Sequence, residues 1–519
     1  MPAHTGLSGF GSLFRPALLV VAVSVLILFA APVLGLRAPI PLDYNEGWNA
    51  YASMRALGLG GGPLYLAPGG LVANNYPPLS FFITGCLGWW FGDMIVAGRV
   101  AALVSLLASA GLAGAIARRC GARGPAIAAT VLLLLLYVGA FSRDYVAMDD
   151  PQWLGIAIML TAVLVFVSGS PHPDDAGGLT PTRIIMTAAL MVTAGMVKHN
   201  VLTWPAAVTL ELAIAVIPRS GSRKWGGKEL RNLGIWLASG VGFAALAVGL
   251  CVALFGPVFL TDMLHHPRVI DFSRILGGAR RTSEILVMAL VALTLVGSGK
   301  RIPHGRLLVL AAGCSIVWTL IQRAGEGVAM NAWFEPLTIL SILTGVALSV
   351  AACRRTGDSV RGLARITSRL GAGGLLFIAL LPCLLSARVV LPRALYQAVH
   401  IRAEARQWRA FVDKVRQQPG DVGCSMASIC YWAGKHNVID VFNYTEYVAT
   451  GGDRGAFSQL LARHELSGFV LPDDFTKGDF DRRDREHIRQ KELLKSVIDH
   501  SRLGPISPDG KLRLYLFDR

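Results

Sequence analysis

Long apolar runs, separated by short polar stretches, fill roughly the first three quarters of the chain. A helix needs about 20 apolar residues to cross the hydrocarbon core of a bilayer. Membrane β-barrels instead alternate apolar and polar positions over about ten residues, and the sequence shows no such alternation. The pattern predicts a polytopic α-helical membrane protein with eleven spans, near residues 16–36, 94–117, 124–140, 153–169, 184–197, 201–217, 232–256, 284–298, 306–321, 333–353 and 371–389.

One further apolar run, Leu79–Phe91, follows Pro77 and Pro78 and is too short to cross a bilayer. We interpret it as a re-entrant or interfacial helix. With this run left out and the N-terminus inside, loops rich in Lys and Arg, such as 118–123 and 354–369, fall on the cytoplasmic side. Counting it as a crossing would move every later basic loop outside, against the positive-inside rule.

This topology brings the acidic and polar motifs to one face of the membrane, the face away from the cytoplasm. We therefore predict a multi-pass inner (plasma) membrane protein with a large first outer loop at 37–93. The segments expected on the outer side are Asp43–Glu46, Arg143–Asp150, Lys198–Asn200, Asp262–His266, Glu326–Glu335 and everything after Pro392.

The composition supports a membrane protein and gives no reason to expect a nucleic-acid partner. Hydrophobic residues make up 53% of the 519 positions and charged residues only 16%, whereas soluble domains carry about 25% charged residues. The formal net charge of +16 is what basic cytoplasmic loops produce. The sequence contains no RNA- or DNA-binding motif.

The C-terminal region, from about residue 392, has the composition of a soluble domain. We predict a membrane domain at 1–391 and a small extracytoplasmic α/β domain at 392–519. Cys424 and Cys430 lie in this region and are expected to be able to pair in an oxidising compartment. Helical patterns at 404–417, 456–464 and 491–500 alternate with strand-like runs at 438–441, 468–471 and 512–517.

The first outer loop carries candidate chemistry in Asp43, Asn45 and Glu46. In a helix, Asp43 and Glu46 lie three residues apart on one face. Two such carboxylates suit abstraction of a proton from a hydroxyl, or chelation of a divalent metal ion such as Mg²⁺ or Mn²⁺. An interfacial helix capped by Asp43 is the plainer interpretation, and composition alone does not choose between them.

The same loop continues through Tyr76-Pro77-Pro78-Leu79 into an apolar helix, and Arg99 follows shortly after. An acidic first outer loop followed by this step resembles the C-type (GT-C) glycosyltransferases, in particular the protein-mannosyltransferase-like and lipid A aminoarabinose-transferase-like branch. The family commonly has an adjacent Asp-Glu pair, whereas here Asn45 precedes Glu46 and Asp43 stands two residues earlier. Which carboxylate is the base is therefore left open.

Later segments extend the resemblance. Asp150-Pro151 corresponds to an Asp-Pro at a helix start in the family, although an Asp cap with Pro at the first position is good helix chemistry by itself. Lys198 corresponds to a lysine that the family assigns to the lipid phosphate, although a Lys at this depth also snorkels to water. The candidate residues are Asp43 and Glu46 for catalysis; Asn45, Tyr76, Arg143, Asp149, Asp150, Lys198, His199, Glu326, Asn331 and Glu335 for substrate; and Asp43, Glu46 and Asp150 for a metal ion.

The resemblance and the topology together imply a glycosyltransferase. Nucleotide sugars are cytosolic, so an outward-facing site is expected to use a polyprenyl-phosphate-linked donor. A hexose or pentose would pass to a hydroxyl of a cell-envelope lipid, glycan or protein. The alternative is a transporter or flippase of lipid-linked saccharides, which would place polar residues near the bilayer midplane; here the acids are expected at helix ends.

Overall fold

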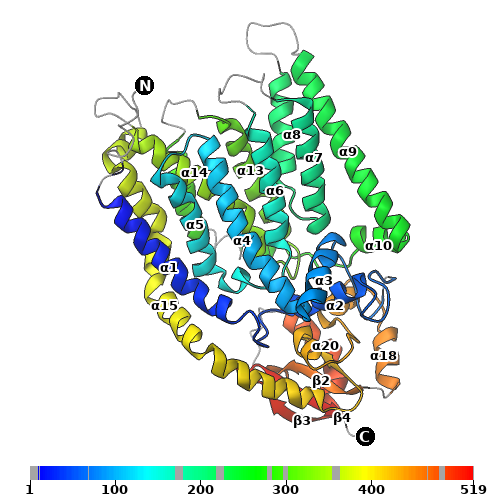
Figure 1. The fold of residues 1–519 in the computed structure, drawn as a ribbon. Helices are drawn as coiled ribbons and strands as arrows, with labels where there is room; N and C mark the ends of the chain where they lie inside the picture. Colours follow the sequence, from blue (N-terminus) through cyan, green and yellow to red (C-terminus); the bar gives the residue numbers. More distant parts are fainter. Residues whose placement is uncertain are drawn as a thin grey trace.

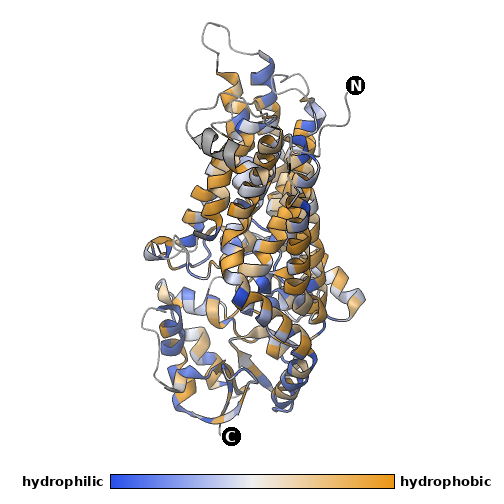
Figure 2. Cartoon of the chain, turned by 90° about the vertical axis from the view of Figure 1, so that its left-hand side faces the viewer, coloured by the Kyte–Doolittle hydropathy of each residue, from blue (hydrophilic) through white to orange (hydrophobic). Residues whose placement is uncertain are grey.

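A helical bundle and a small α/β unit make up the chain, and Figure 1 shows the α/β unit against one end of the bundle. The structure is a computed structural model, and it describes residues 10, 12–67, 69–169, 179–217, 227–276, 283–295, 302–353, 363–463, 466–477 and 485–517. The helices of the bundle are predominantly apolar along their length, whereas the α/β unit mixes hydrophilic and hydrophobic residues (Figure 2).

Each of the eleven predicted spans overlaps a helix of the bundle, and residues 296–298 of the span predicted at 284–298 lie outside the described residues. Six helices are long and apolar enough to cross a membrane, and the others are shorter apolar helices packed among them. The membrane helices are α1 (Phe14–Leu34), α4 (Met94–Arg119), α5 (Pro125–Phe141), α6 (Gln152–Val167), α7 (Pro181–Val197), α8 (Thr203–Val216), α9 (Gly227–Phe255), α12 (Ser283–Leu293), α13 (Gly305–Arg323), α14 (Phe334–Ala352) and α15 (Leu363–Arg416).

Short helices gather at the end of the bundle that faces the α/β unit. The interfacial helix predicted at Leu79–Phe91 is α3, with the same bounds. Its last residues, Trp89 and Trp90, are exposed, as expected for aromatic side chains at a bilayer surface. The other short helices here are α2 (Tyr44–Ala56), η2 (Arg143–Val146), α10 (Val258–Leu264) and η5 (Met330–Trp333).

The last membrane helix, α15, continues out of the bundle and along the α/β unit without a break at the predicted boundary. It runs 54 residues, with a kink at Gly371 and Pro382 and Pro392 inside it. The boundary predicted between 391 and 392 thus falls within one helix, and the first strand begins only at Asp421. A single helix, α15, therefore runs from the bundle into the α/β unit.

The sheet of the α/β unit has four strands in the order β1-β2-β4-β3. β1 pairs with β2 in parallel, with Val422 opposite Gly468, and the other pairs are antiparallel. The elements are β1 (Asp421–Cys424), α16 (Ala427–Trp432), α17 (Val441–Ala449), α18 (Gly455–Ala462), β2 (Leu466–Pro472), α19 (Asp474–Lys477), α20 (Arg485–Asp499), β3 (Ser501–Ile506) and β4 (Leu512–Phe517).

The strand predicted at 438–441 is wrong. The Asp440 carboxylate accepts a hydrogen bond from the Asn443 backbone N–H and caps α17, which begins at Val441. An N-cap at this position ends the extended run and starts a helix. The strands predicted at 468–471 and 512–517 are confirmed within β2 and β4.

Helix α16 docks the α/β unit on α2. A Cβ on Gly47 of α2 would lie 1.9 Å from the backbone N of Ser428, so the two backbones are in direct contact. The Tyr51 hydroxyl donates to the Lys435 carbonyl at 2.6 Å. Cys424 and Cys430, whose pairing was expected to be possible, form a disulfide that links β1 to α16. The helix carrying Asn45 and Glu46 thus contacts the α/β unit directly.

Candidate functional site

The polar segments predicted to share one side of the bundle do meet at one end of it. Asn49 of α2 donates to the Asp149 carbonyl at 2.6 Å, and Lys198 reaches Asp150. The backbone N–H of Glu326 bonds to Val269 in the segment after α10. The convergence expected from the helix count is confirmed.

Asp43 caps α2 and keeps part of its carboxylate available. Its Oδ1 accepts the Asn45 backbone N–H at 3.1 Å, and its side chain is only partly buried. Burial raises the pKa of Asp43 to about 6, assisted by the negative charges of Asp150, Glu46 and Asp144 and opposed by the Asn45 hydrogen bond. The cap and a basic carboxylate are therefore compatible in one residue.

Glu46 is committed to a buried ion pair. Both of its carboxylate oxygens accept from Arg99 of α4, at 2.7 and 2.8 Å, and its side chain is fully buried. Arg99 also donates to backbone carbonyls in the segment after α1, including Ala38 and Ile40. Glu46 also accepts from the Leu42 N–H. The structure thus gives Glu46 the role of fixing the first loop, on which Asp43 lies.

Asp149 packs behind the site instead of facing it. Its carboxyl lies against Gly98 of α4, where a Cβ would approach its Cγ to 2.0 Å. Burial raises the pKa of Asp149 well above the usual range, with further contributions from Glu46 and Asp150. Asp149 is a packing residue between α4 and the second loop.

Asp150 and Lys198 form the second buried pair. Lys198 Nζ lies 3.3 Å from Asp150 Oδ2 and 3.7 Å from the centre of the Tyr76 ring. Asp150 Oδ1 accepts the Gln152 N–H at 2.8 Å, so the helix-start role and the pairing role coexist. Lys198 does not snorkel: it is 2% exposed.

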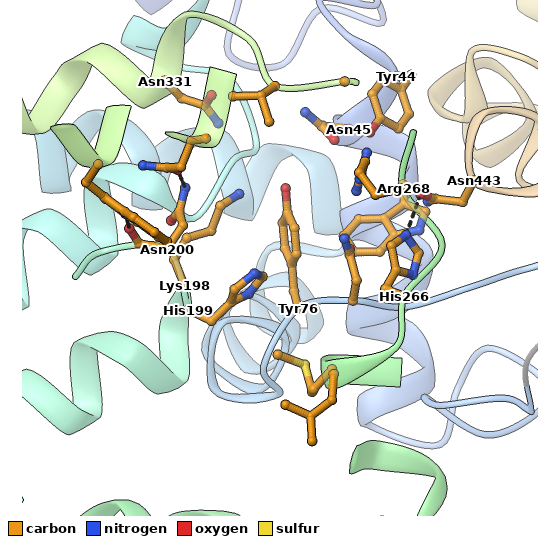
Figure 3. A pocket seen from close by; sticks show the side chains of 18 of the residues that line it. Tyr44, Asn45, Tyr76, Lys198, His199, Asn200, His266, Arg268, Asn331 and Asn443 are labelled. Carbon is orange, nitrogen blue, oxygen red and sulfur yellow. Dashed lines mark hydrogen bonds between the residues drawn. The ribbon is translucent and has the colours of Figure 1, made fainter. Parts of the chain in front are cut away.

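A cavity of about 340 Å³ opens beside this pair (Figure 3). Amide, aromatic and cationic side chains make up its polar wall, and none of the described residues that line it is acidic. The lining residues are Tyr44, Asn45, Trp48, Asn75, Tyr76, Tyr145, Lys198, His199, Asn200, Met263, Leu264, His266, Arg268, Trp318, Gln322, Gly327, Val328, Asn331 and Asn443. Such a wall suits a ligand that combines an anion with many hydroxyls.

Two polar groups of the wall lack a partner within the described residues. The Tyr145 hydroxyl and the Asn200 Oδ1 are buried without a hydrogen bond. Asn200 is otherwise held by its Nδ2, which donates to Gln322 at 2.8 Å. Leaving buried polar groups unpaired costs free energy, and both groups belong to residues that line the cavity.

Arg268 is the functional candidate that sequence reasoning missed. Its guanidinium lies 5.4 Å from the Phe442 ring centre and donates to the Glu326 carbonyl at 2.8 Å. Among the described residues no carboxylate forms an ion pair with it. The sequence could have identified Arg268, because it is a basic residue in a predicted outer loop, where basic residues are few.

The two histidines of the wall are neutral at pH 7. Burial lowers the pKa of His199 to about 4, and the cations Lys198 and Arg268 lower it further. Burial and Arg268 likewise lower the pKa of His266 to about 4, although its hydrogen bond with Asn443 acts in the opposite direction. The cavity therefore takes its positive charge from Lys198 and Arg268.

Five of the ten predicted substrate residues do not line the cavity: Asp149 and Asp150, described above, and Arg143, Glu326 and Glu335. The Arg143 side chain bonds to Gln397 of α15, because η2 turns it toward that helix. Glu326 is paired with Arg489 of α20. Glu335 is buried at the start of α14, where it accepts from the Thr203 hydroxyl at 2.8 Å. Asn45, Tyr76, Lys198, His199 and Asn331 do line the cavity, and their substrate roles stay predictions.

The metal candidates do not assemble into a metal site. Among the described residues no group of three His, Cys, Asp or Glu side chains is placed to hold an ion. Glu46, one of the three candidates, has both oxygens on Arg99. The residues present do not fit a divalent ion held by the protein alone.

Solved membrane-enzyme structures resemble the whole chain. No protein-family model and no curated protein matches the sequence. ArnT from Cupriavidus metallidurans bound to undecaprenyl phosphate is 15% identical, with a TM-score of 0.60, over 97% of this chain and 98% of that one; its apo state gives 16%, 0.58 and the same coverage. The oligosaccharyltransferase AglB from Archaeoglobus fulgidus, in complex with an inhibitory peptide and a dolichol-phosphate, is 11% identical over 98% of this chain and 75% of that one, with a TM-score of 0.48. The chain therefore has the GT-C fold that ArnT adopts, with a small sheet domain at its C-terminus.

Proposed function

We propose that this protein is a membrane glycosyltransferase that moves a hexose or pentose from a polyprenyl-phosphate-linked donor to a hydroxyl of a cell-envelope acceptor. The observation that carries the proposal is the cavity at the end of a membrane bundle: two cations, six amide side chains and aromatic rings line it. Asp43 is not among the lining residues, but the two residues that follow it, Tyr44 and Asn45, are. The likeness to ArnT bound to undecaprenyl phosphate supports a lipid-linked donor.

The electrostatics suit the departure of a phosphate. Lys198 and Arg268 reach the cavity from two sides. Lys198 is already paired with Asp150, whereas Arg268 has hydrogen-bonding capacity to spare, because a guanidinium carries five N–H donors. Fixed donors in a dry site stabilise charge that develops in the transition state. We therefore assign Arg268, and not the predicted substrate residue Arg143, as the second cation that binds the phosphate.

The reaction follows from these placements. Asp43 removes the proton from the acceptor hydroxyl, and the oxygen attacks the anomeric carbon of the sugar. The bond between that carbon and the phosphate oxygen breaks, and the polyprenyl phosphate leaves with the electron pair. Lys198 and Arg268 hold the phosphate, and the amide side chains of the wall bind sugar hydroxyls. No step requires a metal ion.

We place the cavity and the α/β unit on the extracytoplasmic side of the inner membrane. Two observations support this orientation. Arg118 and Arg119 end α4 and Arg306 lies in the first turn of α13, whereas the other ends of these helices carry Met94, which contacts Tyr431 of the α/β unit, and Gln322, which lines the cavity; basic residues gather on the cytoplasmic side. The Cys424–Cys430 disulfide is typical of an oxidising compartment. A flippase is not favoured, because the paired acids lie at helix ends beside the cavity instead of along a path through the bilayer.

The test is a transfer assay with purified protein in lipid nanodiscs. Undecaprenyl-phosphate hexoses and pentoses are offered with an envelope lipid extract as acceptor, and release of undecaprenyl phosphate is measured. Wild-type protein should release it and Asp43→Asn should not, while both proteins bind undecaprenyl phosphate equally. If no donor is consumed, but the protein equilibrates a lipid-linked sugar between leaflets of a vesicle, the flippase is correct and the transferase is not.

A further inference from the structure

The α/β unit supplies one wall of the cavity. Asn443, on α17, is the cavity residue that comes from this unit, and it is 5% exposed. In Figure 3 its side chain points toward His266, and the two are joined by a hydrogen bond. Asn443 Oδ1 lies 3.1 Å from His266 Nε2. A residue 177 positions away thus contacts the loop that follows α10.

Helix α17 contacts that loop at three residues, His266, Arg268 and Val269. Asn443 bonds to His266, the Phe442 ring lies under Arg268, and Glu446 Oε2 accepts the Val269 N–H at 2.8 Å. The Phe442 ring also packs on Tyr44, with ring centres 5.1 Å apart. The position of the loop in the cavity wall is therefore set by the α/β unit.

The direction of the hydrogen bond between Asn443 and His266 follows from Asp440. The Asp440 carboxylate accepts both the backbone N–H and the side-chain Nδ2 of Asn443. Burial raises the pKa of Asp440, whereas these hydrogen bonds and the nearby Arg268 and Arg55 lower it. An ionised carboxylate accepts and does not donate, so in this form Asp440 takes the NH₂ of the Asn443 amide and leaves its oxygen to His266. That oxygen needs a donor. His266 must then carry its proton on Nε2, and its Nδ1 is left as an acceptor.

We propose that His266 recognises a hydroxyl of the transferred sugar through Nδ1, and that Asp440 and Asn443 fix its tautomer and ring orientation from the α/β unit. His266 lines the cavity, and within the described residues the bond to Asn443 is its one hydrogen bond. The neutral ring that burial produces is the form able to accept. This inference rests on the proposed function, since it assigns a sugar to the cavity.

His266→Gln separates recognition from packing. A glutamine amide places an NH₂ donor near the former Nε2, so the bond to Asn443 is kept, while the Nδ1 acceptor is lost. The matched control is His265→Gln, because His265 is the adjacent residue, is exposed and does not line the cavity. Asn443→Leu removes the orienting contact and leaves His266 in place.

Binding to nanodisc-embedded protein is measured by native mass spectrometry for undecaprenyl phosphate and for its glucose, galactose and mannose esters. His266→Gln should weaken the preferred ester about tenfold and flatten the order of the three, with bare undecaprenyl phosphate unchanged and His265→Gln like wild type. Equal weakening of all four ligands, or an unchanged order, would overturn the proposal. Failure of the wild type to bind any of the four would instead overturn the proposed function.

The tautomer gives a readout that is independent of the sugar. Spectra of ¹⁵N-histidine-labelled protein, assigned by comparison with His266→Gln, should show His266 protonated at Nε2 and free at Nδ1. Asn443→Leu should shift that signal toward a mixture of the two forms. A proton on Nδ1 in the wild type would refute the assignment whatever the protein transfers.

Discussion

Glu46 and Arg99 form a bidentate ion pair that is almost completely shielded from water. The pair joins α2 to α4. Arg99 also donates hydrogen bonds to backbone carbonyls of the segment that leads from α1 into the first loop. An acidic residue that is typical of an active-site motif is thus used here to build the loop. For this reason we propose Asp43, three residues earlier, and not Glu46, as the base.

Removing one partner of this pair should destabilise the fold. Arg99→Met leaves the Glu46 carboxylate buried without its cation, and breaking a buried pair from one side costs about 3–5 kcal/mol. Glu46→Gln keeps the shape and should cost less. Thermal unfolding of detergent-solubilised protein, followed by tryptophan fluorescence, measures the difference. The double variant should recover part of the loss, and additive losses would show that the two residues are not coupled.

The eleven spans and the interfacial helix were predictable because each depends on the length of an uninterrupted apolar run, which can be counted in the sequence. Asp43 and Asp440 illustrate the limit. A helix cap was one of two interpretations that its immediate neighbours allowed for Asp43, and the structure shows that cap. The run at 438–441 was predicted as a strand, because its apolar residues outweighed the cap that Asp440 provides.

The site was only partly predictable, because its pairings are made between distant segments. Lys198 was expected near the acidic loops and does meet Asp150. Nothing local shows that Glu46 meets Arg99 instead of substrate, or that Asn443 reaches the loop after α10. Those partners are chosen by how the helices and the α/β unit pack, and Arg143 turned toward α15 for the same reason.

Gly47 is expected to be required for docking of the α/β unit. In Gly47→Ala the new Cβ meets the Ser428 backbone, which cannot move aside as a flexible side chain would, so α16 must separate from α2. We expect loss of transfer activity and faster proteolysis between the bundle and the α/β unit. Gly111→Ala is the matched control, since a Cβ there meets nothing within 4 Å and Ala favours the helix. Normal activity and protease resistance in Gly47→Ala would show that the contact is dispensable.

Lys198 and Arg268 are expected to divide the binding of the lipid phosphate between them. A hydrogen bond to a charged group contributes about 1.5–3 kcal/mol, so Arg268→Gln should weaken undecaprenyl phosphate about ten- to a hundredfold. Lys198→Met should also leave Asp150 buried without a cation, and so should lower both affinity and thermal stability. Binding and melting are measured on the same preparations. Arg143→Gln should bind undecaprenyl phosphate like wild type. If its affinity fell as much as that of Arg268→Gln, Arg143 in the second loop would be a phosphate-binding residue after all.

The pH dependence of transfer tests the base most directly. Because burial and neighbouring carboxylates raise the pKa of Asp43 to about 6, the carboxylate is protonated and inactive at pH 5 and ionised above pH 7. The rate at saturating donor should rise through about pH 6 and then level off. The pKa of Asp43 is higher in the folded state than its ordinary value of 3.8. Ionisation of Asp43 therefore lowers the free energy of unfolding as the pH rises from about 4 to 6.

Asp43→Asn should abolish both effects, leaving a low rate without that inflection and a fold slightly more stable at neutral pH. Asp144→Asn serves as the control, because Asp144 contributes one of the charges that raise the Asp43 pKa. Its removal should move the inflection to lower pH without abolishing activity. A profile that stays flat between pH 5 and 8 in the wild type would mean that a group other than Asp43 accepts the proton.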